Sequence, residues 1–279
     1  MRLSALVDGL RGVNIAAVEL ALRRRDQARP YVSSCVQQCD ALLKRGLPAR
    51  DPVAFLRTDG GAAAGRGEGA TCVLPAHLHD GGGTRLEELV YLAAATRVLQ
   101  PRKIFEIGTF KGRTTTVFAL NAPEAEIVTL DLPPGGTAGA GYIGSDAELV
   151  RRRNLAEFIS EYGVHDRCRQ VLADSIHFDP RPHAGTVELA FIDGAHTYAY
   201  VKNDTEKAAV MMAPRGLVFW HDYGGKGQFR GITDYLHELH ERFPVYRIFG
   251  TTLAWTTAEN LRRLVPAPGA PAEMPAAIT

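Results

Sequence analysis

The sequence lacks the long apolar run that a membrane-spanning helix requires. No stretch reaches the roughly 18 consecutive apolar residues that mark such a helix. Acidic and polar residues also interrupt the N-terminus, where a signal peptide would carry its apolar region. An excess of one charge is missing too, because 32 basic residues face 31 acidic ones and the net charge is +1 at pH 7. We therefore expect a cytoplasmic protein without membrane or nucleic-acid partners.

Cysteine is scarce, with four residues in a chain of 279. No C-x-x-C pair occurs, which removes the commonest redox and zinc-binding spacings. Cys35 and Cys39 lie on one apolar helical stripe, whereas Cys72 and Cys168 are isolated in the sequence. All four are therefore predicted to be structural side chains rather than disulfide partners or ligands.

The two common phosphate-binding motifs are also missing where they would act. No G-x-x-x-x-G-K-[ST] motif occurs. The apolar strand predicted around Ile104 leads into the turn Gly108-Thr-Phe-Lys-Gly112, which lacks the G-x-G-x-x-G spacing that holds a pyrophosphate at a helix N-terminus. Phosphoryl transfer and NAD(P)-dependent oxidoreduction are therefore alternatives rather than the leading hypothesis.

What the sequence does contain is a repeated placement of acidic residues along and after apolar strands. Glu106 lies within the first strand, where a carboxylate is costly to bury without a cationic partner. Asp131 ends the second apolar run, 25 residues beyond Glu106, which is the spacing of one β-α-β unit. Asp174, Asp193 and Asp222 follow three later apolar runs. Because the carboxyl ends of parallel strands share one edge, these side chains should converge on one crevice of a Rossmann-like, doubly wound α/β fold.

These motifs resemble those of class I S-adenosylmethionine-dependent methyltransferases, roughly from Leu74 to Trp255. The segment from Glu106 to Gly112 is similar to the E-x-G-x-x-x-G motif of catechol and caffeoyl-CoA O-methyltransferases. The segments Asp193-Gly-Ala-His196 and His221-Asp222-Tyr223 resemble a bacterial branch that acts on small molecules such as sugars and antibiotics. The resemblance implies a mostly parallel, seven-stranded sheet and S-adenosylmethionine as the cofactor.

The same resemblance implies roles for individual residues. Glu106 would lie near the methionine ammonium group, Asp131 would bind the ribose, and Asp174 with Ser175 would contact the adenine edge. Asp193 would lie beside the transferred methyl group. A pocket lined by carboxylates suits the positive sulfonium and ammonium of this cofactor. The cofactor-binding residues implied in this way are Glu106, Gly108, Thr109, Gly112, Asp131, Asp174, Ser175 and Asp193.

Methyl transfer to a hydroxyl needs a base or a metal ion, because a neutral hydroxyl is a poor nucleophile. The predicted catalytic residues are Asp193, His196, His221 and Asp222. The resemblance implies a divalent metal such as Mg²⁺ on Asp193, His221 and Asp222, although a histidine is a poorer magnesium ligand than an oxygen donor. His221 is alternatively a general base, because imidazole exchanges protons near neutral pH.

Two acceptor chemistries stay open. One is O-methylation of a sugar hydroxyl, and the other is N-methylation of an amino sugar or aminoglycoside, for which a metal is dispensable. Both would belong to secondary metabolism, for example to antibiotic biosynthesis. A non-catalytic, cofactor-binding dimer is a further alternative.

Composition and periodicity divide the chain into four parts. Residues 1–58 are predicted to form an N-terminal helical extension that joins two subunits in a homodimer. Residues 59–70 form a Gly/Ala-rich linker, and residues 71–258 form the methyltransferase domain. Residues 259–279 are predicted to be a mostly disordered tail.

Two local patterns add detail to the central domain. The segment Thr84-Arg-Leu-Glu87 has the spacing of a capping box and predicts a helix start, and Pro101 predicts the end of that helix. The glycine-rich segment after Asp131 is predicted to be a lid, with Tyr142 as its contact residue.

Overall fold

A computed structural model of the protein describes residues 46–58, 71–75, 83–134, 155–225 and 227–265. The predictions for Cys35, Cys39, Tyr142, the linker 59–70 and most of the N-terminal extension lie outside the described residues. The helices are α3 (Pro52–Thr58), α4 (Leu86–Leu99), α5 (Arg113–Asn121), α7 (Glu157–Glu161), α8 (Tyr198–Met211), α9 (Arg230–Arg242) and α10 (Ala258–Leu261). The strands are β1 (Lys103–Ile107), β2 (Glu126–Asp131), β3 (Cys168–Leu172), β4 (Val187–Ile192), β5 (Met212–Trp220), β6 (Tyr246–Arg247) and β7 (Ala254–Thr257).

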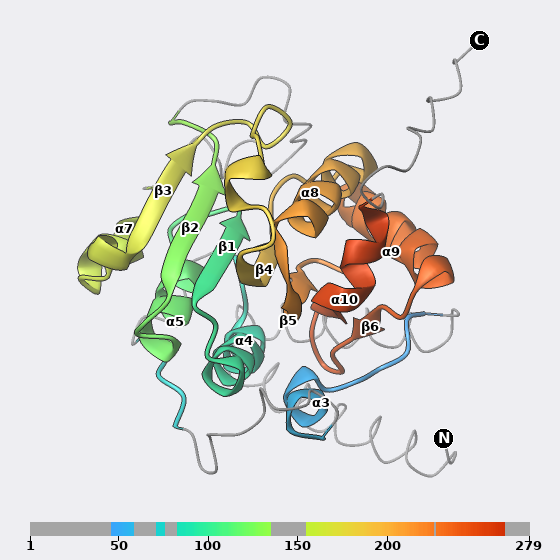
Figure 1. The fold of residues 1–279 in the computed structure, drawn as a ribbon, viewed down its shortest axis with the longest axis horizontal. Coiled ribbons are helices and arrows are strands. Elements are labelled where there is room, and N and C mark those ends of the chain that lie inside the picture. The colour runs from blue at the N-terminus through green and yellow to red at the C-terminus, as the bar shows by residue number, and fades with distance from the viewer. Residues whose placement is uncertain (1–45, 59–70, 76–82, 135–154, 226, 266–279) are drawn as a thin grey trace, which may run out of the picture.

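The strands form one seven-stranded sheet in the order β3-β2-β1-β4-β5-β7-β6. β1 to β5 are parallel, whereas β7 runs antiparallel to both β5 and β6 (Figure 1). The chain winds outward from β1 toward β3 and then returns to β4, so the order reverses between β1 and β4. In such sheets ligands bind outside the carboxyl ends of the strands at this point. The predicted Rossmann-like, doubly wound and mostly parallel sheet is confirmed.

Helices cover both faces of the sheet, which explains why the central strands are apolar along their whole length. On one face α8, α9 and α10 pack on the strands, with Leu236 of α9 in the same core cluster as Val218 of β5 (Figure 1). On the other face α3, α4 and α5 form a second cluster, in which Leu92 and Phe118 join Phe191 of β4. The carboxyl edge of the parallel strands therefore lies between two helical layers.

The helix that opens the domain starts one residue later than the predicted capping box. Its N-cap is Arg85, whose backbone N–H donates to Oε2 of Glu88 at 2.8 Å. The partner is Glu88 rather than Glu87 because Glu88 faces the core and is fully buried, while Glu87 is exposed. α4 ends at Leu99, before Pro101, as predicted. The capping carboxylate thus points inward, toward the carboxyl edge of the sheet.

Residues 46–58 are attached to the far edge of the sheet. Leu47 is buried, and its backbone N–H donates to the hydroxyl of Tyr223 at 2.9 Å. Ala49 forms a parallel bridge with Arg247 of β6. This part of the predicted extension therefore packs on the domain itself.

The described part of the predicted tail is ordered in helical turns. α10 ends at Leu261, which is fully buried, and a 3₁₀ turn continues to Leu264. Arg262 donates to the carbonyl of Met212 at 2.7 Å, which ties this segment to β5. The prediction of disorder remains for residues 266–279, outside the described residues.

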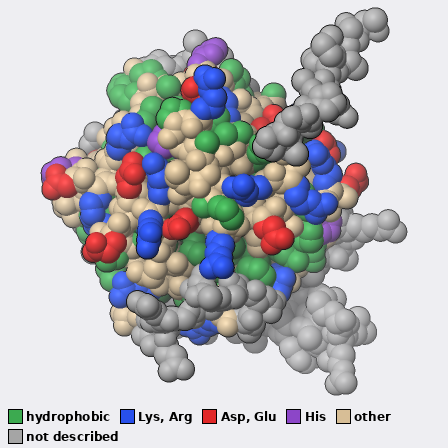
Figure 2. Space-filling view, in the orientation of Figure 1, with side chains coloured by type: hydrophobic (Ala, Val, Ile, Leu, Met, Phe, Trp, Pro, Cys, Tyr) green, Lys and Arg blue, Asp and Glu red, His purple; other side chains and the backbone are tan. Residues whose placement is uncertain are grey.

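The surface carries charges of both signs. Figure 2 shows basic and acidic side chains interspersed on the visible face, in line with the balanced composition. None of the helices in the described segments combines the length and the apolar composition that a bilayer crossing needs. Cys72 and Cys168 are both free thiols, and Cys168 is buried in β3.

Candidate active site

The turn after β1 is shaped by two glycines that cannot be replaced without strain. Gly108 has φ +99°, and a Cβ atom there would lie 2.0 Å from the backbone carbonyl oxygen of Asp193. Gly112 has φ +80°, and its Cβ would lie 2.8 Å from Cγ1 of Ile159. Both positions need glycine because the backbone is left-handed and a neighbour is close. The turn therefore brings the end of β1 against the segment that follows β4.

Glu106 lies in a polar network within the sheet. Its Oε2 accepts hydrogen bonds from the hydroxyls of Thr115 and Thr129, and Thr129 also bonds the hydroxyl of Thr109 at 2.7 Å. Its Oε1 is buried and has no partner among the described residues. Burial outweighs the two hydroxyl donors and raises the pKa of Glu106 to about 8. Glu106 is fully buried and does not line the cavity described below, so its Oε1 is a buried acceptor without a donor among the described residues.

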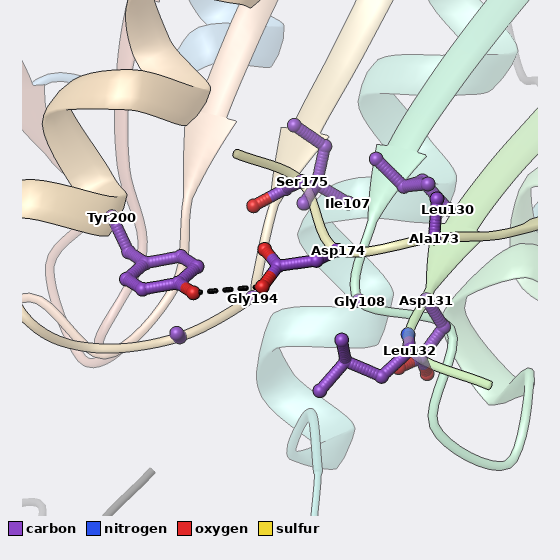
Figure 3. A pocket seen from close by; sticks show the side chains of 11 residues that line it. Ile107, Gly108, Leu130, Asp131, Leu132, Ala173, Asp174, Ser175, Gly194 and Tyr200 are labelled. Carbon is purple, nitrogen blue, oxygen red and sulfur yellow. Dashed lines mark hydrogen bonds between the residues drawn. The ribbon is translucent and has the colours of Figure 1, made fainter. Parts of the chain in front are cut away.

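A cavity opens at the carboxyl ends of β1, β2 and β3. It encloses about 280 Å³ of space, including its mouth. Figure 3 shows its wall, with Tyr200 and Asp174 pointing toward each other. The lining residues are Ile107, Gly108, Leu130, Asp131, Leu132, Ala173, Asp174, Ser175, Gly194, Ala195 and Tyr200. Four of the predicted cofactor-binding residues, from three different strand ends, therefore line one cavity.

Asp131 is held by two backbone donors. Its Oδ2 accepts from the N–H of Phe110 at 2.7 Å, and its Oδ1 accepts from the N–H of Leu132 at 2.7 Å. Phe110 itself has a left-handed φ of 49° in the glycine turn. The turn after β1 thus fixes the carboxylate at the end of β2.

Asp174 and Ser175 form the opposite part of the wall. The hydroxyl of Tyr200 donates to Oδ2 of Asp174 at 3.0 Å. Ser175 contacts the buried carboxyl of Asp204, where burial outweighs that hydrogen bond and raises the pKa of Asp204 to about 6. Lys207 holds the same segment through the backbone carbonyl of Ser175. Side chains of α8 therefore brace this side of the cavity.

A second group of titratable side chains lies next to the cavity, centred on His221. Its Nδ1 is 3.1 Å from Oδ1 of Asp193 and 3.1 Å from Oδ2 of Asp222. Its Nε2 is 2.9 Å from Oε2 of Glu88. Burial alone lowers the pKa of His221, but three surrounding carboxylates raise it well above the ordinary value. Both ring nitrogens of His221 therefore face carboxylate oxygens, an arrangement that favours the imidazolium form.

This arrangement differs from the two predicted roles of His221. A general base needs a free lone pair, and both ring nitrogens of His221 face carboxylates. A metal ligand needs the same lone pair. The geometry favours a role for His221 in supporting Asp193 and Asp222.

Asp222 and His196 complete the group. Nε2 of His196 is 3.3 Å from Oδ2 of Asp222, and its ring packs on Phe229 with centroids 4.6 Å apart. Although burial by itself raises the pKa of Asp222, the neighbouring His221 and His196 hold that pKa below its usual range. Asp222 has a left-handed φ of 59°, a strained conformation that is typical of functional sites when the surrounding structure enforces it.

Asp193 behaves in the opposite way. Burial raises its pKa, against the influence of His221. The pKa values of the two carboxyls beside His221 are therefore shifted in opposite directions. Such pairs are common in acid–base catalysis. Asp193 is the group that carries a proton more readily.

One set of three residues within the described segments meets the spacing of a metal site. Ligand atoms of Asp193, His196 and Asp222 all lie within 4.8 Å of one another. His221, which the sequence predicts as a ligand, is not in this set, and both of its ring nitrogens face carboxylates. Two carboxylates and one imidazole are a mixed oxygen and nitrogen donor set, which matches Mg²⁺ less well than a set of oxygen donors alone.

Residues 105–223 match the model of a family described as a methyltransferase domain. An uncharacterized protein, y4gI, of Sinorhizobium fredii is 25% identical over 141 residues. That match spans 50% of this chain and 15% of the relative, so the chain covers only a small part of that protein's length.

Two solved structures are similar at low identity. S-adenosylhomocysteine-bound methyltransferase PaMTH1 of Podospora anserina is 18% identical with a TM-score of 0.47, over 62% of this chain and 78% of that one. Cofactor-bound Rv0187 from MTB is 20% identical with a TM-score of 0.46, over 79% and 96%.

The central part of the chain, residues 105–223, is similar to a methyltransferase domain. The family match covers β1 to β5, the strands whose ends form the cavity and the His221 group. The predicted enzyme class agrees with that match. Three residues at the site, Glu88, Tyr200 and Thr252, were not predicted from the sequence, because nothing in their local pattern marks them.

Proposed function

We propose that the protein transfers a methyl group from S-adenosylmethionine to a hydroxyl or amine of a polar, sugar-like small molecule. The observation that carries the proposal is the cavity at the switch point of the sheet, which Asp131, Asp174 and Ser175 line. Gly194 and Ala195 connect this cavity directly to Asp193 and His196. A cofactor site and an acid–base group thus share one wall.

The cofactor fits the charges of the cavity. Asp131 is the proposed ribose ligand, and Asp174 with Ser175 is the proposed adenine contact. Glu106 offers its unpartnered Oε1 to the methionine ammonium. A dinucleotide would instead bring a pyrophosphate toward these carboxylates, which is electrostatically unfavourable. This contrast favours S-adenosylmethionine over NAD(P).

Calorimetric titration tests the cofactor directly. S-adenosylhomocysteine should bind the wild-type protein, and NAD should not. Asp131→Asn should weaken S-adenosylhomocysteine binding without loss of the fold. NAD binding, or equal affinity of the variant for S-adenosylhomocysteine, would contradict the proposal.

The reaction is an in-line displacement at a methyl carbon. The bond from the methyl carbon to the sulfonium sulfur breaks, its electrons stay on sulfur, and a lone pair of the acceptor forms the new bond. The acceptor must also lose a proton. We assign this proton to Asp193, because burial raises the pKa of that carboxyl. His221 and Asp222 hold Asp193 and the neighbouring His196 in place.

A divalent metal is the second way to activate a hydroxyl acceptor. Asp193, His196 and Asp222 would hold the ion. When bound, such an ion supplies charge stabilisation for the developing alkoxide. Activity should fall with a chelator and return with Mn²⁺ if the acceptor is a hydroxyl. Activity that is insensitive to chelators would favour an amine acceptor.

The proposed acceptor is a sugar or amino sugar of secondary metabolism, such as an antibiotic precursor or aminoglycoside. The carboxylates of Asp193 and Asp222 suit hydroxyl and ammonium donors, and the ring pair His196–Phe229 offers an apolar face for a sugar ring. A screen of glycosides and amino sugars by mass spectrometry tests this, with a mass gain of one methyl group as the signal. A screen in which only aromatic alcohols react would contradict the proposal.

The homodimer remains a proposal that concerns mainly residues 1–45. Because Leu47 and Ala49 are part of the packed domain, a deletion should stop at residue 45 rather than at residue 58. Light scattering should then report a monomer. A deletion variant that stays dimeric would contradict a dimer held by this segment.

A further inference from the structure

The two carboxylates of the proposed site rest on one side of a single ring. Nδ1 of His221 is 3.1 Å from an oxygen of Asp193 and 3.1 Å from an oxygen of Asp222. One N–H placed between two acceptors fixes both of them only if the ring itself cannot rotate. What holds the ring from its other side therefore decides the geometry of the site.

Glu88 holds the other side of that ring. Its Oε2 lies 2.9 Å from Nε2 of His221, across 133 residues of sequence. The side chain of Glu88 is fully buried, and that of His221 is 7% exposed, so water does not compete for this contact. Burial by itself raises the pKa of Glu88, but the charge of His221 and its hydrogen bond lower it to about 2. Glu88 is thus a buried acidic partner of the His221 ring.

Glu88 is itself fixed by three further donors. Its Oε2 accepts from the backbone N–H of Arg85, and its Oε1 accepts from Thr252 twice, from the N–H at 2.8 Å and from the hydroxyl at 2.7 Å. With His221 this makes four donors, which fill the four acceptor positions of a carboxylate. The carbonyl of Thr252 also accepts from the N–H of Tyr223 at 2.8 Å. The carboxylate therefore has one orientation, set by α4 and by the turn between β6 and β7.

We infer that Glu88 is a positioning residue for methyl transfer: it orients the His221 ring so that Nδ1–H holds Asp193 and Asp222 in their reactive geometry. This inference rests on the proposed function, because it assigns a role to Glu88 at the same site. Glu88 touches neither the cavity wall nor the proposed acceptor position, so it acts through His221. Partners of this kind commonly determine the orientation of the groups that do the chemistry.

The informative variant is Glu88→Gln, because it keeps the size of the side chain and an oxygen for Thr252. Its amide NH₂ would face the Nε2–H of His221, and two donors cannot pair, so the ring must lose that proton or turn away. The matched control is Thr252→Val. It also removes one buried hydrogen bond to Glu88, but leaves the contact between Glu88 and His221 intact.

Two readouts separate positioning from mere stability. Nitrogen-15 spectra of histidine-labelled protein report the protonation and hydrogen bonding of each ring, and the signal missing in His221→Asn assigns His221 among the nine histidines. Glu88→Gln should change the His221 ring signals, and Thr252→Val should leave them in place. With an acceptor in hand, kcat of Glu88→Gln should fall about 10- to 100-fold while KM for S-adenosylmethionine stays unchanged.

Two results would overturn the inference. One is a set of His221 ring signals that is the same in Glu88→Gln and in wild type. The other is a loss of kcat that is equal in Glu88→Gln and Thr252→Val and follows their melting temperatures, which would make the role structural.

Failure of the proposed function looks different. In that case wild-type protein binds no S-adenosylhomocysteine and methylates nothing, yet the comparison of ring signals still decides whether Glu88 orients His221.

Discussion

The carbonyl oxygen of Asp193 lies 2.0 Å from the point where a side chain at position 108 would begin. Gly108 follows β1 and Asp193 follows β4, and these two strands are neighbours in the sheet. The N–H of Asp193 also donates to the carbonyl of Ile107 at 2.8 Å. Gly108 therefore shapes the turn and also allows Asp193, the proposed catalytic residue, to lie against β1.

Replacement of Gly108 by alanine should destabilise the protein severely. The left-handed backbone costs roughly 1–2 kcal/mol in any non-glycine residue, and overpacking adds about 1–3 kcal/mol. We expect a loss of roughly 2–5 kcal/mol in the free energy of unfolding, measured with urea, as the sum of these two effects. Binding of S-adenosylhomocysteine should be lost in any folded fraction.

Gly185→Ala is the matched control for that experiment. Gly185 has φ +68°, and no atom lies within 4 Å of the place that its Cβ would take. This variant should lose only the backbone contribution, about 1–2 kcal/mol. Equal losses of unfolding free energy in the two variants would show that the close approach of position 108 to Asp193 does not affect stability.

Asp131→Asn should weaken cofactor binding while leaving the fold intact. The amide keeps one oxygen for Phe110 or Leu132 but removes the charge that accepts from the ribose hydroxyls. Hydrogen bonds to a charged group contribute about 1.5–3 kcal/mol, so affinity for S-adenosylhomocysteine should fall roughly 10- to 150-fold by calorimetry. Asp179→Asn, which alters an acidic residue paired with Arg181 on the surface, should bind like wild type.

The sequence predicts the parts of the site that depend on strand order alone. Asp131, Asp174 and Asp193 converge because parallel strands bring their carboxyl ends to one edge, whatever the details of packing. The glycines of the first turn are predictable for a similar reason, since a left-handed turn leaves few other residues possible.

Contacts that cross between layers are not predictable in this way. Glu88 reaches His221 only because α4 packs at a particular height on the sheet, and no local pattern encodes that height. The sequence pattern also predicts the capping box one residue early, because it does not show which glutamate faces the core. Burial selects Glu88 over Glu87 as the capping carboxylate. The role of His221 also depends on this packing, because an imidazole between three carboxylates donates, whereas an isolated one can accept.

Tyr200→Phe should weaken cofactor binding modestly. The substitution removes the hydroxyl that donates to Oδ2 of Asp174 at 3.0 Å and leaves the ring in place. Only part of the roughly 1.5–3 kcal/mol that a hydrogen bond to a carboxylate contributes should reach the bound cofactor, so affinity for S-adenosylhomocysteine should fall roughly fivefold. Tyr198→Phe is the control, because that hydroxyl pairs with Glu238 away from the cavity. A larger effect of Tyr198→Phe would contradict the placement of the adenine beside Asp174.

Glu106 should make the ligand-free protein less stable as the pH rises. Its carboxyl has an ordinary pKa of 4.5, and burial raises the pKa to about 8 in the folded state. Between these values the folded protein holds one more proton than the unfolded chain. The stability that this proton provides is complete below pH 4.5 and is lost toward pH 8, by about 1.4 kcal/mol per pH unit.

Glu106→Gln removes this dependence, because the amide is neutral at every pH. At pH 8 the ligand-free variant should therefore melt at a higher temperature than wild type, while the two should be similar near pH 4.5. Glu124→Gln, on the surface, should follow wild type at both pH values. A ligand ammonium beside the unpartnered oxygen would favour the ionised carboxyl, so stabilisation by S-adenosylhomocysteine should grow with pH in wild type and stay flat in Glu106→Gln. A Glu106→Gln protein that is less stable than wild type at pH 8 would show that the carboxyl is ionised and paired in the folded state.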